Sequence, residues 1–147
     1  MKVEAVYENG KAEIIEAEDK KFDDFIIKNK PNMIEKGIKT YNFIYSTEGL
    51  NELLGIERTC DTCRNFYTQP IMGGGKCEIQ NNKGVCYEDS CESYKIRISY
   101  AISQLAYKIS KRYSLPESIV EIKINNYLLD GLSWEEIIAK YKEANNE

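Results

Sequence analysis

Hydrophobic and polar residues alternate between residues 2 and 17, which is the pattern of two half-buried strands. Asn9-Gly10 lies at the centre of the pattern, and the apolar positions before and after it are Val3, Ala5, Tyr7, Ala12 and Ile14. Asn-Gly supplies the two positive-φ positions of a type I′ turn. The segment is therefore predicted to form a β-hairpin.

A helical spacing of apolar residues begins at about Asp19, and the predicted inner side carries Phe22, Phe25, Ile26 and, as a further candidate, Ile27. Pro31 is predicted to end this helix because the residue before a proline avoids the helical region. Residues 38–45 return to a period of two, with Tyr41, Phe43 and Tyr45 on one face. They are predicted to add a strand to the sheet of the hairpin.

A short helix is predicted after this strand, with Ser46 or Thr47 as its cap and Gly55 as its left-handed end. Residues 95–147 are predicted to form three helices, because apolar residues recur there at helical spacing. Two capping boxes, which begin at Ser114 and Ser133, are predicted to start the second and third of these helices.

These patterns predict an α+β fold in one compact unit. A small N-terminal sheet with helices occupies residues 1–59, a loop-rich cysteine module occupies residues 60–94, and a three-helix segment occupies residues 95–147. The chain has 147 residues, of which 42% are apolar, so it can bury a core without help from a metal.

Charge and composition exclude several classes of function. The net charge of −4, from 24 acidic and 20 basic residues, does not indicate a general nucleic-acid-binding surface. No apolar run approaches the roughly 20 residues of a membrane span, and no secretory signal is recognised, so a soluble cytoplasmic protein is expected. The chain has no His, which excludes His-ligated metals and catalysis with imidazole as the base.

All five cysteines lie between residues 60 and 94, and Cys60 and Cys63 form a Cys-x2-Cys pair. In a reducing compartment this clustering favours a metal site over disulfides. The set of four ligands can be completed by Cys77 and Cys91 or by Cys86 and Cys91. The first set has widely spaced cysteines, which favours a [4Fe-4S] cluster, whereas the second has two close pairs, which favours Zn²⁺.

The segment resembles the cluster-binding region of high-potential iron-sulfur proteins and of related accessory subunits of some anaerobic glycyl-radical enzymes. The resemblance lies in the Cys-x2-Cys with a following aromatic, the Gly-containing loop to Cys77, and the aromatic after Cys91. It implies a [4Fe-4S] cluster on Cys60, Cys63, Cys77 and Cys91, shielded by Phe66, Tyr67 and Tyr94. Asp89-Ser90 replace the Gly-aromatic pair that tends to precede the last ligand in that family, which would let water closer and lower the potential.

Basic residues on the first C-terminal helix are candidate phosphate contacts: Arg97, Lys108, Lys111 and Arg112. Residues 95–147 nevertheless contain 8 basic and 7 acidic side chains, and no aromatic or Asn/Gln set sits beside the basic residues to read bases. A partner protein is therefore expected in preference to nucleic acid.

The sequence leads to the expectation of a small cytoplasmic metal-centre protein without catalytic activity, which acts as a protein-interaction or accessory module. An iron-sulfur redox subunit and a metal-containing nucleic-acid-binding regulator are the alternatives.

Overall fold

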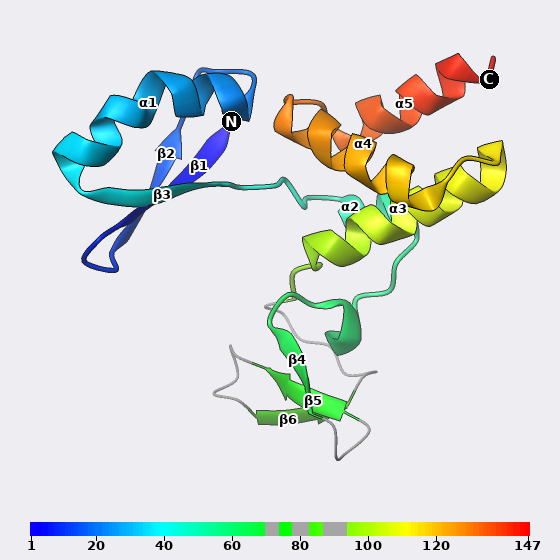
Figure 1. Cartoon of the computed structure of the whole chain (residues 1–147). Coiled ribbons are helices and arrows are strands. Elements are labelled where there is room, and N and C mark those ends of the chain that lie inside the picture. Colours follow the sequence, from blue (N-terminus) through cyan, green and yellow to red (C-terminus); the bar gives the residue numbers. More distant parts are fainter. Residues whose placement is uncertain (70–73, 78–82, 87–93) are drawn as a thin grey trace. The chain divides into compact units, whose positions relative to one another are not determined.

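The computed structural model describes residues 1–69, 74–77, 83–86 and 94–147 (Figure 1). The fold is α+β, with a small antiparallel sheet near the N-terminus and a helical C-terminal segment. The chain forms two compact units, one of residues 1–46 with 122–147 and one of residues 47–121. None of the helices in the described ranges is long and apolar enough to cross a membrane.

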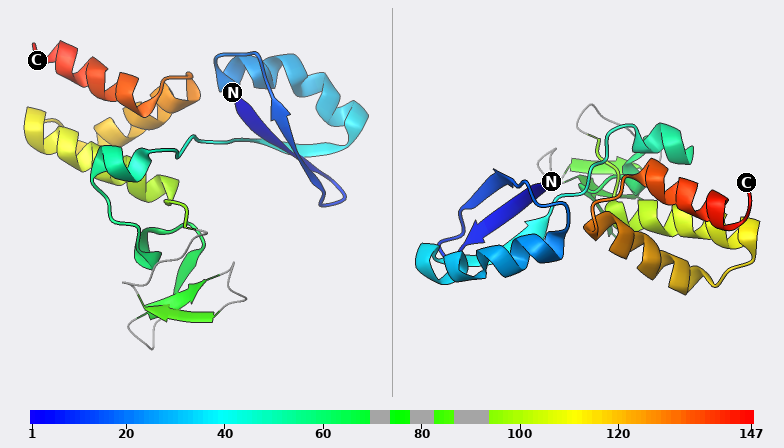
Figure 2. Two further views of the ribbon diagram at one scale, coloured as in Figure 1. Left: turned by 180° about the vertical axis from the view of Figure 1, so that it is seen from behind. Right: turned by 90° about the horizontal axis from the view of Figure 1, so that it is seen from above.

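The first unit contains a three-stranded antiparallel sheet with the order β2-β1-β3. Its strands are β1 (Lys2–Tyr7), β2 (Ala12–Glu16) and β3 (Ile38–Phe43). Helix α1 (Phe22–Lys36) lies along one face of the sheet (Figures 1 and 2). The core between the helix and the sheet consists of Val3, Ala5, Phe25, Ile38 and Tyr41.

The hairpin is confirmed, but its turn and its inner face differ from the expectation. The backbone N–H of Tyr7 donates to the carbonyl of Lys11 at 2.8 Å, so the loop has three residues, and Gly10 takes the positive φ of 85°. Three-residue loops of this kind place a left-handed residue at the third position. Val3 therefore pairs with Ile15, whereas a two-residue turn would have paired Ala5 with Ile14. Because this slip of one residue exchanges the two faces of β2, Ile14 is 56% exposed and the expected inner face was wrong.

Helix α1 continues through Pro31 and ends at Lys36, where Gly37 has the left-handed conformation with φ 66°. The predicted end at Pro31 was wrong, because the packing of one apolar face against the sheet outweighs the missing N–H. Ile27 lies on the opposite side of the helix and is 73% exposed, so it does not belong to the core.

Aromatic rings join α1 to β3. The Phe25 and Tyr41 rings meet edge to face with centroids 5.0 Å apart, and the Phe22 and Phe43 rings do so at 5.7 Å. The aromatic residues of β3 thus contribute to the packing of the sheet against α1.

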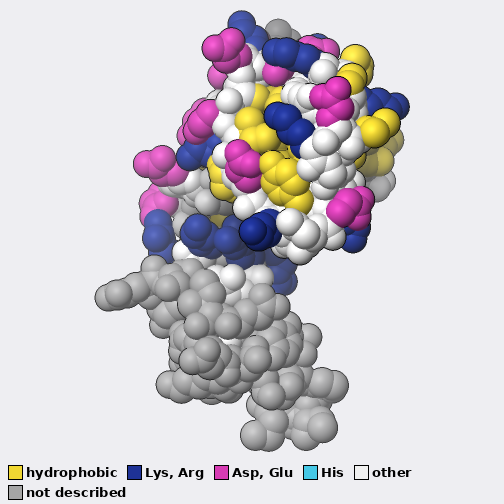
Figure 3. All heavy atoms as spheres, turned by 90° about the vertical axis from the view of Figure 1, so that its left-hand side faces the viewer, with side chains coloured by type: hydrophobic (Ala, Val, Ile, Leu, Met, Phe, Trp, Pro, Cys, Tyr) yellow, Lys and Arg dark blue, Asp and Glu magenta, His cyan; other side chains and the backbone are white. Residues whose placement is uncertain are grey.

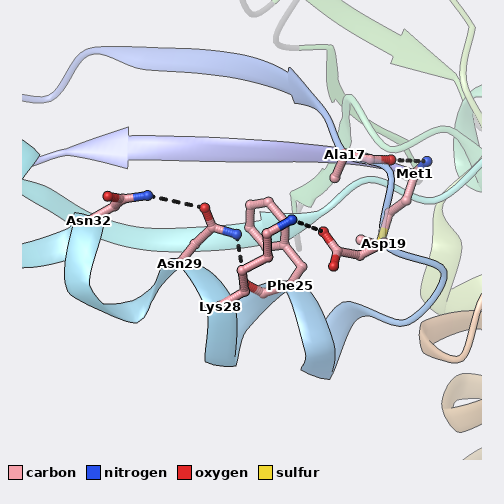
Figure 4. A network of polar contacts seen from close by, with 7 residues as sticks. All are labelled: Met1, Ala17, Asp19, Phe25, Lys28, Asn29 and Asn32. Atoms are coloured by element: carbon pink, nitrogen blue, oxygen red, sulfur yellow. Dashed lines mark hydrogen bonds and ion pairs between the residues drawn. The ribbon is translucent and has the colours of Figure 1, made fainter.

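Polar contacts hold the start of the chain and the segment before α1 (Figure 4). The N-terminal ammonium of Met1 donates to the Ala17 carbonyl at 3.1 Å, and the Lys28 ammonium lies 3.9 Å from the Asp19 carboxylate. The contacts fix the end of β2 and the approach to the helix.

The C-terminal helices α4 (Glu117–Leu129) and α5 (Trp134–Ala144) contact the segment after β3. The Trp134 indole N–H donates to the Ser46 carbonyl at 2.9 Å, and the Tyr45 hydroxyl donates to the Asn125 side chain at 2.9 Å. The predicted cap at Ser133 is confirmed, since its hydroxyl accepts from the Glu136 N–H at 3.1 Å.

Two other predicted caps are wrong. Ser114 has φ 53° and forms the left-handed end of α3 (Ile98–Tyr113) instead of starting α4. Helix α2 (Leu50–Leu54) is preceded by Gly49 in the left-handed region, with no side-chain cap from Ser46 or Thr47. Ser114 lies three residues before the first residue of α4, and Ser46 and Thr47 lie before the N-cap Gly49 of α2, so none of these hydroxyls stands at an N-cap position.

The second unit contains α2, a one-turn 3₁₀ helix η1 (Cys60–Thr62), a second sheet and α3. The sheet has the antiparallel order β4-β5-β6, with β4 (Phe66–Gln69), β5 (Gly74–Cys77) and β6 (Lys83–Cys86). This region was expected to be rich in loops, and its short strands carry little alternation in sequence.

Hydrophobic side chains lie exposed among charged ones on the face of the molecule drawn in Figure 3.

Candidate metal centre

The Cys-x2-Cys pair forms a tight, buried turn. The Cys63 N–H donates to the Cys60 carbonyl at 3.1 Å across η1, and both cysteines are 4% exposed. They form a buried cluster with Phe66, and Tyr94 packs against it. Two residues that the resemblance assigns to shielding therefore lie beside the two predicted ligands.

The turn is attached through its backbone to the segment that enters α3. Cys63 and Ile96 form an antiparallel bridge, which is flanked by hydrogen bonds from the Arg64 N–H to the Lys95 carbonyl at 2.7 Å and from the Arg97 N–H to the Thr62 carbonyl at 2.9 Å. Ile96 is buried. The bridge fixes the position of the Cys60–Cys63 turn relative to the start of α3.

A relay of hydroxyl and amide groups ties the same turn to α2. The Asn51 side-chain N–H donates to the Tyr94 hydroxyl at 2.9 Å, and the Tyr94 hydroxyl lies 2.7 Å from the Thr62 hydroxyl. Thr62 in turn donates toward the Thr59 carbonyl at 3.0 Å. Asn51 and Thr62 are both buried polar residues, so the relay satisfies groups that would otherwise be costly inside the protein.

Arg97 holds the turn from outside. Its Nη2 donates to the carbonyls of Asp61 at 3.2 Å and of Cys63 at 3.3 Å. The sequence indicated Arg97 as a phosphate contact, and the structure gives its guanidinium these carbonyl partners. Arg97 therefore contributes to the shape of the Cys-x2-Cys turn.

Asn65 provides a polar contact to a candidate ligand atom. Its Nδ2 donates to Cys63 Sγ at 3.7 Å, and the residue is buried. An N–H aimed at sulfur stabilises negative charge there, and bonds of this kind tune thiolate ligands in metal sites. Two buried thiols on one rigid turn, with an amide donor at one of them, fit a thiolate-bound metal.

The remaining cysteines are placed only in part. Cys77 is 3% exposed and pairs with Phe66 across β4 and β5, and Phe66 itself belongs to the cluster of Cys60 and Cys63. Cys86 pairs with Gly74 through the backbone of β6, and β6 lies against η1. Cys91 and the side chains of Cys86 and Tyr67 lie outside the described residues.

Among the side chains that the structure describes, no three Cys, Asp or Glu groups come together as metal ligands. Cys60, Cys63 and Cys77 thus do not complete a site by themselves.

The other predicted phosphate contacts lie apart from Arg97. The Lys108 ammonium donates to the Leu54 carbonyl at the end of α2. Lys111 lies over the Tyr107 ring at 5.5 Å, and Arg112 lies over the Tyr113 ring at 5.8 Å. Tyr107 lies one helical turn before Lys111, and residues four apart are neighbours on a helix surface. These contacts are made within the chain and do not test whether the basic residues bind phosphate.

Sequence reasoning found the cysteines but missed Asn51 and Asn65. Asn65 carried a signal, since it follows the second cysteine by two residues. Asn51 carried none, because it reaches the site through the fold. Comparison of the chain with protein-family models, with curated proteins and with solved structures finds no match.

Proposed function

We propose that this chain is a small metal-centre protein without catalytic activity, which presents its cysteine module to a partner protein. Thiolates of Cys60, Cys63, Cys77 and Cys91 hold one [4Fe-4S] cluster, with Zn²⁺ on Cys60, Cys63, Cys86 and Cys91 as the alternative. The observation that carries the proposal is the buried Cys60–Cys63 turn, which is fastened to both α2 and α3.

Metal binding would give a role to the Cys60–Cys63 turn, which hydrogen bonds hold in place. The described part of the module contains a buried cluster of Cys60, Cys63 and Phe66, with Tyr94 packed against it. Metal-thiolate bonds supply folding free energy where a hydrophobic core is small. A preformed turn also lowers the entropy lost when the ligands converge.

A binding or accessory role suits the chemistry of the chain better than catalysis does. The sequence contains no His, so the side chain that most often acts as a general base in catalysis is missing. The proposal places the protein in the cytoplasm, where clustered thiols stay reduced. An iron-sulfur subunit that exchanges electrons with a partner enzyme remains the second candidate, and the Asn65 contact to Cys63 Sγ favours it over a nucleic-acid regulator.

The first test is the absorption spectrum of anaerobically purified protein, with iron, sulfide and zinc measured on the same sample. We expect a broad band near about 400 nm and about four irons per chain. A colourless protein with one zinc per chain would replace the cluster by the zinc alternative. A protein that contains neither metal after anaerobic purification and reconstitution would contradict the proposal.

Serine variants then identify the ligands. Cys60→Ser and Cys63→Ser should each release the metal, because an incomplete set of thiolates loses most of its binding free energy. Cys77→Ser should do the same and Cys86→Ser should retain the metal if the [4Fe-4S] set is correct. Retention of the metal in Cys77→Ser together with its loss in Cys86→Ser would instead assign the zinc set, which contains Cys86 in place of Cys77.

A further inference from the structure

We propose that Arg64 and Lys95 form a docking site for a short acidic segment of the partner protein, directly beside the metal centre. The two residues lie opposite each other across the short bridge, where the Arg64 N–H donates to the Lys95 carbonyl at 2.7 Å. Each is the chain neighbour of a bridge residue, Arg64 of Cys63 and Lys95 of Ile96.

The pleat of the bridge separates the cations from the buried residues. Cys63 and Ile96 are buried, whereas Arg64 and Lys95 are exposed. Because neighbouring residues of an extended chain point to opposite faces, the two cations share the outer face of the ribbon whose inner face carries the candidate ligand. An anionic segment bound there would lie against the module that holds the metal.

Two like charges directly opposite each other destabilise a strand pair, so the fold gains nothing from this arrangement. The ion pairs that the described residues form include Lys2–Glu16, Lys28–Asp19 and Arg58–Glu52, and none of these three involves Arg64 or Lys95. An acidic ligand would remove the repulsion and add charge-assisted hydrogen bonds to both side chains. The pair therefore has the charge and the exposure of a binding site for two carboxylates.

The surroundings favour a short acidic peptide over nucleic acid. Asp61 is exposed on the adjoining turn, and the whole chain carries a net charge of −4, so a long polyanion would meet repulsion on leaving the pair. The inference rests on the proposed function in taking the partner to be a protein. The pair contains no cysteine, so a failure to bind peptide can be told apart from a failure to bind metal.

The test uses the full chain as purified, with its metal content measured, and a fluorescein-labelled peptide rich in Asp and Glu. The control peptide has Asn and Gln at those positions, and a single-stranded DNA of equal charge is the third probe. Anisotropy titrations are made at about 20 mM and about 200 mM salt, because binding through exposed charges weakens as the Debye length shortens. We expect the acidic peptide to bind best and the neutral peptide not to bind.

Arg64→Gln with Lys95→Gln should weaken peptide binding about tenfold, as expected when two exposed ion pairs are lost. The matched control is Lys111→Gln with Arg112→Gln, which removes the same charge from the same unit and should change binding less than twofold. Equal losses in both double variants would show unspecific attraction and overturn the proposal. Tighter binding of the DNA than of the peptide would also overturn it and would favour nucleic acid. Unchanged circular dichroism of both variants shows that the fold is kept.

Discussion

Tyr94 is the residue through which the Cys60–Cys63 turn and α2 depend on each other, and Tyr94→Phe tests this directly. The substitution removes the hydroxyl that accepts from Asn51 and contacts Thr62, and it leaves the ring in place against the cysteine cluster. We expect a loss of stability that comes from hydrogen bonds alone.

The size of this stability loss follows from the hydrogen bonds that Asn51 and Thr62 keep in the variant. Asn51 Nδ2 keeps its bond to the Ile56 carbonyl at 3.1 Å but loses a partner for its other N–H, and the residue is buried. Thr62 keeps the carbonyl of Thr59 as its acceptor. Two lost hydrogen bonds at about 0.5–1.5 kcal/mol each, one of which leaves a buried donor unsatisfied, amount to about 2–3 kcal/mol. For a chain of this size the midpoint of thermal unfolding should fall by about 5–10 °C.

Urea unfolding, with circular dichroism as the signal, measures the free energy of unfolding. Tyr107→Phe is the control because Tyr107 is about half exposed. The control should change the free energy by less than about 0.5 kcal/mol. A double-mutant cycle with Thr62→Val should give a coupling energy of about 1 kcal/mol. Equal stability of Tyr94→Phe and Tyr107→Phe, or a coupling energy near zero, would refute the reasoning.

Three further substitutions test the first unit by thermal unfolding. Pro31→Ala should stabilise it by about 1–2 kcal/mol, because alanine restores an N–H for the Ile27 carbonyl within α1, and a lower midpoint would show that the helix needs the proline. Gly131→Ala should cost about 2–4 kcal/mol, since a Cβ would lie 2.2 Å from the Lys20 carbonyl oxygen at φ 90°, and an unchanged midpoint would contradict that close approach. Tyr141→Phe should stabilise by about 1 kcal/mol, because the buried Tyr141 hydroxyl has no hydrogen-bond partner among the described residues. Burial also raises the pKa of Tyr141, so ionisation of its hydroxyl disfavours the folded state. The free energy of unfolding of the wild type, relative to that of Tyr141→Phe, should therefore stay constant below about pH 10 and fall as the pH rises further.

The sequence predicted elements better than it predicted their junctions. Alternation and helical spacing identified the hairpin, β3 and the C-terminal helices, because a buried face imposes its period on the residues that form it. The register of the hairpin was missed because Asn9-Gly10 suits both a two-residue and a three-residue loop, and packing on α1 decides between them. Pro31 and Ser114 were misread for a related reason, since tertiary contacts override local preference at both.

The candidate site shows the same division. The Cys60 and Cys63 pair was visible because its spacing is local, and Phe66 follows it closely in the chain. The groups that hold the turn come from distant parts of the sequence, since Asn51 and Tyr94 are 43 positions apart and Cys63 and Arg97 are 34 positions apart. Periodicity carries no information about such pairs, so the relay and the role of Arg97 required the fold.

The discontinuity of the first unit has a consequence for synthesis on the ribosome. The contact between Ser46 and Trp134 spans 88 positions, and all of residues 47–121 are made between its two halves. At a typical elongation rate the Ser46 carbonyl waits about 4–18 s for the indole to be polymerised. The cysteine module is therefore translated, and able to take up metal, before the unit that was begun first can close around its last helix.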